Sequence, residues 1–520
     1  MYFALVLVCA ALQLAPVTPP KPAERTPLRP NLVFILGEGQ GWSSTSVDLD
    51  AREPSTARPA GLTPNLVTLA GRGMRFSDYY AMAPRCTPSR ASFFTGIGPA
   101  KLHMTYVNES GANKRDERAG EPSAPPRVLP PSPRNELPPG VKTTGDVLRA
   151  AGYATAHFGK WHVGRVDPAQ HGFDVSDGAN SNQGPERGEA PNPKQSVAIT
   201  NRGIEFVRAQ VQAKKPFFVQ MSHYAVGSEA EVTPESLAAT RELMPELRGK
   251  ALVYAAGMRD MDVAIGRVLA VLRELGVESS TYVFVSTDHG TPGGAGGGRQ
   301  AALANPPFSG GKGSVREGGV RVPFLVAGPG IEPGSVCSVR AGGIDLLPTL
   351  LELAGAPLAK PEQPDDPLAV EGASLVSVLQ HGGTGAIARP REEFVIHYPH
   401  EDLGNGGPAS AVYLGSWKLV RNYETQQVML YDLAHDPAEA ADLAAREPER
   451  VKALTARLDA YLAAVRAQMP RPNDGSAAPR DDGETRKGRA RGKDEERGRE
   501  GTRSLVPEEH AQTGDDCDDE

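Results

Sequence analysis

Cys86 opens the short segment of this chain whose residue types best suit catalysis, Cys86-Thr87-Pro88-Ser89-Arg90. Pro88 is tolerated in the first turn of a helix and Ser89 can accept a hydrogen bond from a free N–H there. Cys86 is therefore predicted to lie just ahead of a helix N-terminus. Such an end carries a partial positive charge that would stabilise an oxyanion beside Cys86, and Arg90 adds a planar cation one turn later. The alternative is a partly buried free cysteine on an ordinary turn.

Acidic and imidazole side chains follow two predicted strands. Residues 31–36 (NLVFIL) form a continuous apolar run of strand length, typical of a strand buried on both faces of a parallel sheet, and Glu38 comes directly after it. A second strand is predicted at residues 281–286 and is followed by Asp288 and His289. Because α/β sheets bind ligands at the carboxyl ends of their strands, these side chains are well placed for a metal. Asp288 could instead cap a turn.

Basic side chains follow two further predicted strands. Lys160 and His162 come after the strand predicted at residues 153–158, and His223 comes after the strand predicted at residues 216–222. Taken alone, a lysine and a histidine two residues apart at a strand end would most often be solvated surface.

These segments resemble, in the same order along the chain, the motifs of the sulfatase family. The matching motifs are Cys-x-Pro-Ser-Arg with Thr-Gly at 86–96, Gly-Lys-Trp-His at 159–162, Ser-His-Tyr-Ala-Val at 222–226, Asp-His at 288–289, and Gly-Gly-Lys-Gly with Glu-Gly-Gly-x-Arg-x-Pro at 310–323. The resemblance covers about residues 30–465. Arg85 stands where the family usually has an aliphatic residue.

The resemblance implies hydrolysis of a sulfate ester of a carbohydrate or aryl substrate. A separate formylglycine-generating enzyme would oxidise Cys86 to formylglycine (3-oxoalanine), whose hydrated aldehyde attacks sulfur. The implied catalytic residues are Cys86, Arg90, Lys160, His162 and Lys312. The implied substrate-binding residues are Lys160, His162, Lys312, His223 and His397.

The resemblance also implies a divalent cation, Ca²⁺ or another such as Mg²⁺, held by Glu38, Cys86, Asp288 and His289. Glu38 replaces the first aspartate of the family's pair and Gly39 the second, although the amide oxygen of Gln40 could help. One carboxylate fewer weakens a site for a hard cation that prefers six to eight oxygens.

Gly227 stands where the family's catalytic histidine is expected, and His223, four residues earlier, is not given that role. Losing a positioned proton donor costs roughly 10²- to 10⁴-fold in rate. Two alternatives to an active sulfatase therefore stay open. One is a catalytically impaired relative that binds sulfated glycans, and the other is a phosphate or phosphonate ester hydrolase on the same fold.

The expected fold is α/β, with a large central, mostly parallel sheet flanked by helices, as in alkaline phosphatase, over residues 30–385. Short alternating strands from about residue 392, followed by a helix at 448–468, predict a smaller antiparallel sheet with a helix over residues 390–470. His397 and His400 could line the substrate cleft or serve a structural role. Residues 108–142, rich in Pro, Arg and Glu, are predicted to form a surface insertion.

The two ends of the chain differ in character. Residues 1–20 carry an apolar run of signal-peptide length, too short for a stable membrane span, which predicts export to a periplasmic or extracellular location. A buried strand or helix is the alternative. Residues 471–520 are charged and are predicted to be disordered.

The whole chain has 520 residues, a formal net charge of -7, and four cysteines that do not form a disulfide framework. The charge argues against a nucleic-acid partner. The partners expected are a sulfated small molecule or glycan and the formylglycine-generating enzyme.

Overall fold

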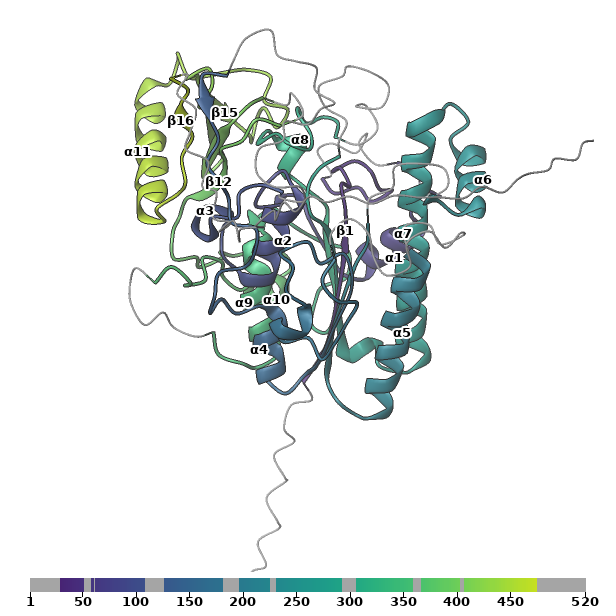
Figure 1. Ribbon diagram of the computed structural model, residues 1–520. Coiled ribbons are helices and arrows are strands. Elements are labelled where there is room, and N and C mark those ends of the chain that lie inside the picture. Colours follow the sequence, from purple (N-terminus) through teal and green to yellow (C-terminus); the bar gives the residue numbers. More distant parts are fainter. Residues whose placement is uncertain are drawn as a thin grey trace, which may run out of the picture. The chain divides into compact units, whose positions relative to one another are not determined.

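A central sheet of eight strands positions the residues singled out above in this computed structural model (Figure 1). The order across the sheet is β10-β2-β9-β8-β1-β7-β5-β6. The strands are β1 Asn31–Gly37, β2 Met74–Phe76, β5 Ala154–Gly159, β6 Val175–Ser176, β7 Phe217–Ser222, β8 Thr281–Thr287, β9 Phe324–Ala327 and β10 Ser335–Cys337. Most neighbours are parallel, and β9 runs antiparallel to β2 and β8. The mostly parallel sheet is confirmed.

The structure describes residues 29–50, 58–59, 61–107, 126–180, 196–224, 231–291, 305–358, 366–402 and 406–474. The predicted signal peptide at 1–20 lies outside these residues. Gly227 and residues 475–520 of the predicted charged tail lie outside them as well.

Helices cover both faces of the central sheet, as Figure 1 shows. On one side lie α1 (Pro64–Arg72), α5 (Ser196–Gln212) and α7 (Gly249–Glu274), with α6 (Pro234–Leu243) beside α7. On the other side lie α2 (Cys86–Thr95), α4 (Thr144–Ala150), α9 (Leu346–Leu353) and α10 (Val376–Gln380). Two short helices, α3 (Pro99–Leu102) and α8 (Glu317–Val320), also belong to the larger part of the chain, which is the part that contains the central sheet.

The central strand β1 shows why helices are needed on both faces. Successive side chains of a strand point to opposite faces, and here Leu32, Phe34 and Leu36 pack into the core that includes α2 and α9. Val33 and Ile35 pack into the core that includes α1, α5 and α7. A strand that is apolar on both faces requires two helical layers, as the sequence pattern predicted.

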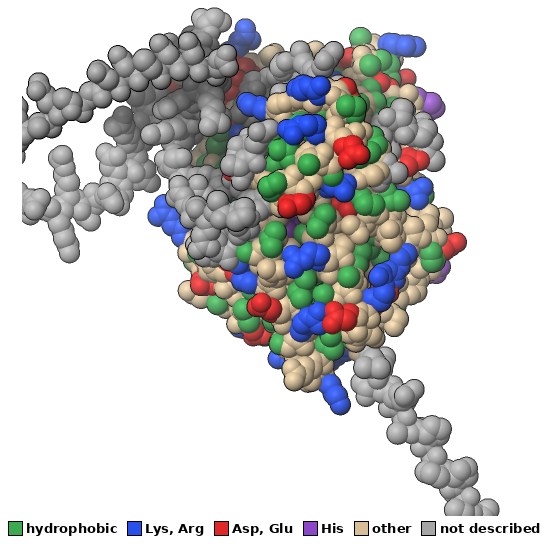
Figure 2. Space-filling model, turned by 90° about the vertical axis from the view of Figure 1, so that its right-hand side faces the viewer, with side chains coloured by type: hydrophobic (Ala, Val, Ile, Leu, Met, Phe, Trp, Pro, Cys, Tyr) green, Lys and Arg blue, Asp and Glu red, His purple; other side chains and the backbone are tan. Residues whose placement is uncertain are grey.

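The outer surface of the helix layer that contains α5, α6 and α7 faces the viewer in Figure 2. Lys and Arg side chains are interspersed there with Asp and Glu side chains. Among the helices that the structure describes, none has the length and apolar character required to cross a bilayer.

A smaller antiparallel sheet lies in the C-terminal part, also as predicted. Its strands, in order, are β12 (Phe394–Tyr398), β13 (Ala409–Leu414), β14 (Trp417–Asn422) and β15 (Val428–Asp432). Helix α11 (Pro448–Ala464) packs on one face, and the other face packs on residues of the larger part such as Tyr80 and Ile344. This sheet is therefore held between α11 and the structure that carries Cys86.

The start of the predicted disordered tail needs correction. Residues Arg471–Pro472 form strand β16, which pairs with β4 (Val128–Leu129) in the predicted surface insertion. The backbone hydrogen bonds of this pairing order the chain as far as Asn473, whose N–H donates to the Arg127 carbonyl. A two-strand ribbon, β3 (Tyr79–Tyr80) with β11 (Ala341–Gly342), completes the described strands.

Candidate active site

Glu38, Cys86, Asp288 and His289 come together in the buried interior, with their possible ligand atoms within 4.8 Å of one another. Glu38 follows β1, while Asp288 and His289 follow β8. The two strands are parallel neighbours with Gly37 opposite Thr287. Their carboxyl ends therefore deliver three of the four side chains to one point, as the sheet-edge argument predicted.

Cys86 reaches this point as the first residue of α2, which corrects the expectation that it lies just ahead of the helix. Arg85 has extended backbone angles (φ -141°, ψ 155°) and is the N-cap, and no side chain caps this end. The hydroxyl of Ser89, predicted to cap it, is buried and has no hydrogen-bond partner among the described residues. The unpaired N–H groups at the start of α2 thus lie beside the cysteine itself.

The thiol of Cys86 lies between an acid and an imidazole. Its Sγ is 3.3 Å from Glu38 Oε1 and 3.2 Å from Nε2 of His289, whose ring is oriented by a 2.8 Å hydrogen bond from Nδ1 to the Gly290 carbonyl. Burial and the Glu38 carboxylate raise the pKa of the thiol. The charges of Lys160, Lys312 and His289 outweigh them and hold this pKa well below its ordinary value. The site therefore favours negative charge at position 86.

Basic side chains lie around the Glu38 carboxylate. Lys160 Nζ lies 2.8 Å from Glu38 Oε2, and Lys312 Nζ lies 3.9 Å from Glu38 Oε1. Burial raises the pKa of Glu38, but Lys160, Lys312 and Arg90 outweigh it and bring this pKa well below its usual range. Glu38 is therefore ionised, as a metal ligand must be.

Arg90 was expected to fork onto a bound anion, and the structure gives protein partners to two of its three guanidinium nitrogens. Its Nε donates to Asp288 Oδ2 at 2.9 Å and its Nη1 donates to the Lys160 carbonyl at 2.8 Å. Nη2 is buried with no hydrogen-bond partner among the described residues. Arg90 thus orients Asp288 and retains one donor group that a buried anion could use.

The loop after β5 delivers Lys160 and His162 through a tight backbone turn. Gly159 has φ +88°, and a Cβ there would lie 2.0 Å from the Ser222 carbonyl oxygen, so only glycine fits. His162 has φ +60°, and its N–H donates to the Asn180 carbonyl at 3.0 Å. The Asn180 side chain also bonds the Gly159 carbonyl and the Trp161 N–H. Sequence reasoning missed Asn180, because a single Asn outside any motif gives no signal.

The loop that carries Lys312 is hydrogen-bonded to the segment after β8 and to the segment before α2. The Lys312 N–H donates to the Thr291 carbonyl at 2.8 Å, beyond β8, and the Gly313 N–H donates to the Pro84 carbonyl at 3.0 Å, just before α2. These backbone bonds place Lys312 beside Cys86.

Gly39 stands where a second carboxylate was expected. It has φ +64°, its N–H donates to Asp288 Oδ1 at 3.2 Å, and its carbonyl accepts from Tyr254 at 3.2 Å. The neighbouring Gln40 directs its amide nitrogen to the Met261 sulfur on α7. Gly39 therefore orients Asp288 through its N–H and supplies no carboxylate of its own.

Two predicted substrate-binding histidines occupy different surroundings. His223 is buried after β7, its N–H donates to the Leu36 carbonyl at 2.8 Å, and burial together with Arg90 lowers its pKa to about 4. His397 is not brought to the cluster. Its ring bonds the Ser410 hydroxyl (2.6 Å) and the Gln468 carbonyl (2.9 Å) within the C-terminal part, where burial lowers its pKa to about 4. These contacts favour the structural alternative for His397.

The four clustered residues suit a divalent cation. Lys160 and Arg90 bind Oε2 of Glu38 and Oδ2 of Asp288. The other two oxygens face the cluster, where Oε1 lies 3.3 Å from Cys86 Sγ and Oδ1 accepts from the Gly39 N–H at 3.2 Å, within reach of a metal beside the His289 nitrogen. The fourth ligand, sulfur, is soft, whereas Ca²⁺ and Mg²⁺ bind oxygen. Conversion of Cys86 to a hydrated aldehyde would replace that sulfur with oxygen.

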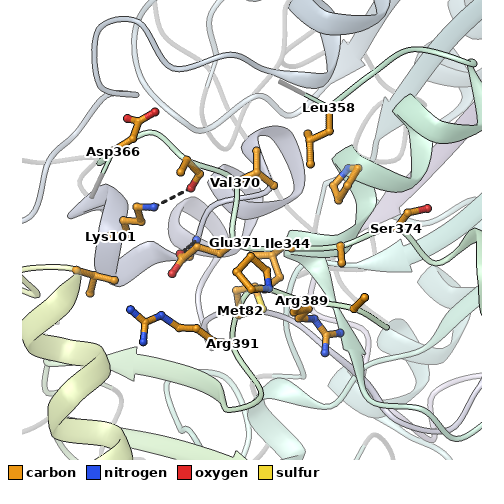
Figure 3. Close-up of a pocket in the computed structure, with 18 of the residues that line it drawn as sticks. Met82, Lys101, Ile344, Leu358, Asp366, Val370, Glu371, Ser374, Arg389 and Arg391 are labelled. Carbon is orange, nitrogen blue, oxygen red and sulfur yellow. Dashed lines mark hydrogen bonds between the residues drawn. The ribbon is translucent and has the colours of Figure 1, made fainter. Parts of the chain in front are cut away.

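A separate cavity of about 1230 Å³ lies between the larger part and α11 (Figure 3). Lys101 donates to the Ala369 carbonyl at 2.8 Å, shown as a dashed line, and Glu371 accepts from the Gly98 N–H at 2.7 Å. None of the clustered residues lines this cavity, and these polar groups have protein partners. The chemistry therefore belongs to the cluster around Cys86.

Comparison with known proteins bears on both parts of the chain. A family model described as Sulfatase matches residues 30–356, and one described as N-sulphoglucosamine sulphohydrolase, C-terminal, matches residues 311–468. Arylsulfatase A of Bos taurus is 30% identical over 456 residues, covering 81% of this chain and 80% of that protein. N-acetylgalactosamine-6-sulfatase of Mus musculus is 28% identical over 454 residues, covering 80% and 75%.

Among solved structures, Ps i-CgsB in complex with k-i-k-neocarrahexaose resembles this chain with a TM-score of 0.64 and 22% identity. The match covers 84% of this chain and 93% of that protein. A likeness at this identity shows a common fold.

Proposed function

This chain belongs to the sulfatase family, and from that premise we propose that it hydrolyses a sulfate ester of a carbohydrate or aryl substrate. The observation that carries the proposal is the buried cluster of Glu38, Cys86, Asp288 and His289, with the amines of Lys160 and Lys312 beside Glu38. Together these residues would supply a nucleophile, anionic ligands for a metal and cations for a sulfate group.

Cys86 is the proposed nucleophile after oxidation to formylglycine by a separate formylglycine-generating enzyme. In that form, residue 86 would supply an oxygen nucleophile for the sulfur atom of the ester, while the ester S–O bond breaks and the alcohol leaves with a proton. Negative charge then develops on the sulfate oxygens, and the amines of Lys160 and Lys312 stabilise it because preorganised cations in a buried site cost no reorganisation. Arg90 contributes its unpaired Nη2, and His162 completes the proposed catalytic set.

The proposed metal ligands are Glu38, Asp288, His289 and residue 86. A divalent cation, Ca²⁺ or another such as Mg²⁺, would supply Lewis-acid polarisation of the sulfate group. Arg90 and Lys160 hold the two carboxylates in place, and His289 is oriented by the Gly290 carbonyl.

Export to a periplasmic or extracellular location, with removal of residues 1–20, remains part of the proposal, as do domain limits of 30–385 and 390–470. The location rests on the apolar N-terminal run alone.

Mass spectrometry of the peptide that contains residue 86, from the native host, tests the modification directly. It is paired with an assay of 4-nitrophenyl sulfate hydrolysis by the wild type and by Cys86→Ala. We expect an aldehyde at position 86, turnover by the wild type, and loss of all turnover in Cys86→Ala with little change in melting temperature.

Each alternative gives a different result in the same experiment. An unmodified cysteine with no turnover, but with retained binding of sulfated glycans, would favour a non-catalytic relative. Turnover of 4-nitrophenyl phosphate in preference to the sulfate would favour a phosphoesterase. Full sulfatase activity in Cys86→Ala would exclude the proposed mechanism.

A further inference from the structure

Arg85 is the one residue of the cysteine motif that the family resemblance does not explain. Its side chain is 14% exposed, as is that of Lys312, whereas the side chains of Glu38, Lys160 and Arg90 are at most 4% exposed. Among these residues, Arg85 and Lys312 are therefore the ones most accessible to a molecule that approaches from solvent.

The guanidinium of Arg85 is held along one edge only. Its Nε and Nη2 donate to the two carboxylate oxygens of Asp402, whose side chain is fully buried and also accepts from the Tyr398 hydroxyl at 2.6 Å. Among the residues that the structure describes, none accepts from Nη1. The Asp402 pairing thus fixes the plane of the guanidinium and leaves two N–H groups of Nη1 available.

This pair lies against the loop that carries the sulfate-binding lysine. A Cβ added to Gly313 would lie 3.2 Å from both the carbonyl and a carboxylate oxygen of Asp402, and the Gly313 N–H bonds the Pro84 carbonyl. The start of α2, the Lys312 loop and the C-terminal part therefore meet at Arg85. A sulfate bound beside Lys312 would therefore lie on the loop that packs against this pair.

We propose, on the basis of the proposed function, that Arg85 selects the alcohol part of the substrate by donating from Nη1 to a hydroxyl of a sugar ring that carries the sulfate. Asp402 is its positioning residue. The pair is electrically neutral overall, so it suits an uncharged oxygen better than a second anion. The Tyr106 ring lies 6.0 Å from the guanidinium carbon and supplies an adjoining aromatic surface. A sulfated sugar fits this subsite, whereas an aryl sulfate offers no hydroxyl to it.

Binding to a catalytically silent background tests the subsite without requiring turnover. In Cys86→Ala protein, calorimetry would compare the 2-, 3-, 4- and 6-sulfates of galactose with cyclohexyl sulfate, which has a saturated ring without hydroxyls. We expect the best galactose sulfate to bind about 10-fold or more tightly than cyclohexyl sulfate, because a hydrogen bond to a charged donor contributes about 1.5 kcal/mol or more. Adding Arg85→Ala should remove this advantage by weakening the sugar sulfate alone.

Two further variants keep the result interpretable. Arg85→Lys retains the charge but lacks the planar fork, so it should lose the sugar advantage at an unchanged melting temperature even if Arg85→Ala folds poorly. Arg421→Ala removes an arginine that pairs with Asp459 on the surface of the C-terminal part and should leave both affinities unchanged.

Equal weakening of galactose sulfate and cyclohexyl sulfate in the Arg85 variants would overturn the proposal, as would no change in either. Tighter binding of galactose 2,6-disulfate that depends on Arg85 would also overturn it, because the subsite would then select a second anion. If the wild type hydrolyses 4-nitrophenyl sulfate in any of these cases, the proposed function still stands and only the Arg85 subsite is excluded. If the wild type does not hydrolyse it but the Arg85-dependent preference for the sugar sulfate is intact, only the proposed function is excluded.

Discussion

Buried Glu38 depends on its basic neighbours, since an ionised carboxylate without partners would be very costly in the interior. Lys160 is the nearest of them, with Nζ 2.8 Å from Glu38 Oε2, and both side chains are almost fully buried. The same lysine has a proposed role on the sulfate. Its contributions to folding and to catalysis can be separated, because only the first depends on the charge of Glu38.

Replacing Lys160 by Met should therefore lower both stability and activity. We expect a loss of about 3 kcal/mol in the free energy of unfolding, since breaking a buried pair leaves an uncompensated charge, and a loss of about 10²- to 10³-fold in kcat. The double variant Glu38→Gln/Lys160→Met should recover most of the stability and none of the activity. Urea unfolding and the sulfate ester assay check the two effects, and recovery of activity in the double variant would contradict a direct role for Lys160.

Gly39 offers a test of the missing carboxylate. Its N–H lies 3.2 Å from Asp288 Oδ1, so an added side chain would start close to the proposed metal ligands. Gly39→Asp should bind Ca²⁺ about 10-fold more tightly than Gly39→Asn, because the number of charged ligands sets affinity for this ion. Both residues tolerate φ +64° at a cost of about 1 kcal/mol. Calorimetry with the metal-free proteins measures the difference, and equal affinities would place the metal elsewhere.

At the scale of elements, the C-terminal sheet anchors the loop that carries Lys312. Lys418 on β14 is fully buried. Its Nζ donates to the Val315 carbonyl at 2.9 Å and to Glu317 Oε1 at 2.9 Å, and it forms an ion pair with Glu439 Oε1 at 2.8 Å. Burial raises the pKa of Glu317, but Lys418 and Arg321 outweigh it and lower this pKa. The position of Lys312 therefore depends on a strand about a hundred residues further along the chain.

Removing this anchor should affect folding and catalysis together. Lys418→Met leaves two buried carboxylates without their shared cation, so we expect a loss of about 3–5 kcal/mol in the free energy of unfolding. Near-wild-type kcat in the protein that still folds would argue against the positioning role. Arg421→Ala, on the same strand but in a surface pair with Asp459, is the matched control and should change stability by less than about 1 kcal/mol.

The positions of site residues could be predicted from the sequence where a rule about a single segment of the chain was sufficient. An apolar run such as residues 31–36 defines a strand buried on both faces, and the rule that ligands bind at strand carboxyl ends then places Glu38 and Asp288 together. The contacts of Lys418 and Asn180 could not be predicted, because nothing local specifies which buried groups meet across such separations. His397 marks the limit of such rules, because a histidine on an alternating strand is compatible with a cleft residue and equally with a core residue.

At the scale of the whole molecule, neutral histidines buried away from the cluster make folding sensitive to acid. Burial, with a contribution from Arg90, lowers the pKa of His157 to about 3. Burial, with a contribution from His397, lowers the pKa of His400 to about 3, and burial lowers the pKa of His397 to about 4. All three are below the value of about 6.5 that histidine has in an unfolded chain. The unfolded state therefore binds more protons than the folded state between about pH 4 and pH 6.5.

Stability should consequently be complete above about pH 6.5 and should fall as the pH drops toward 4. Each of the three histidines contributes a slope of up to about 1.4 kcal/mol per pH unit in that window. His397→Gln keeps a donor for the Gln468 carbonyl and cannot be protonated, so it should reduce the slope by up to about 1.4 kcal/mol per pH unit. The exposed His435, replaced by Gln, serves as the control. Urea unfolding at pH 7.5, 6.5, 5.5 and 4.5 measures these slopes. An unfolding free energy that stays constant from pH 7.5 to 5 would contradict this prediction, because it would mean that the folded protein accommodates charged imidazoles. The surroundings of His397 and His400 argue against that outcome, since no acidic side chain among the described residues stabilises the charged form of either ring.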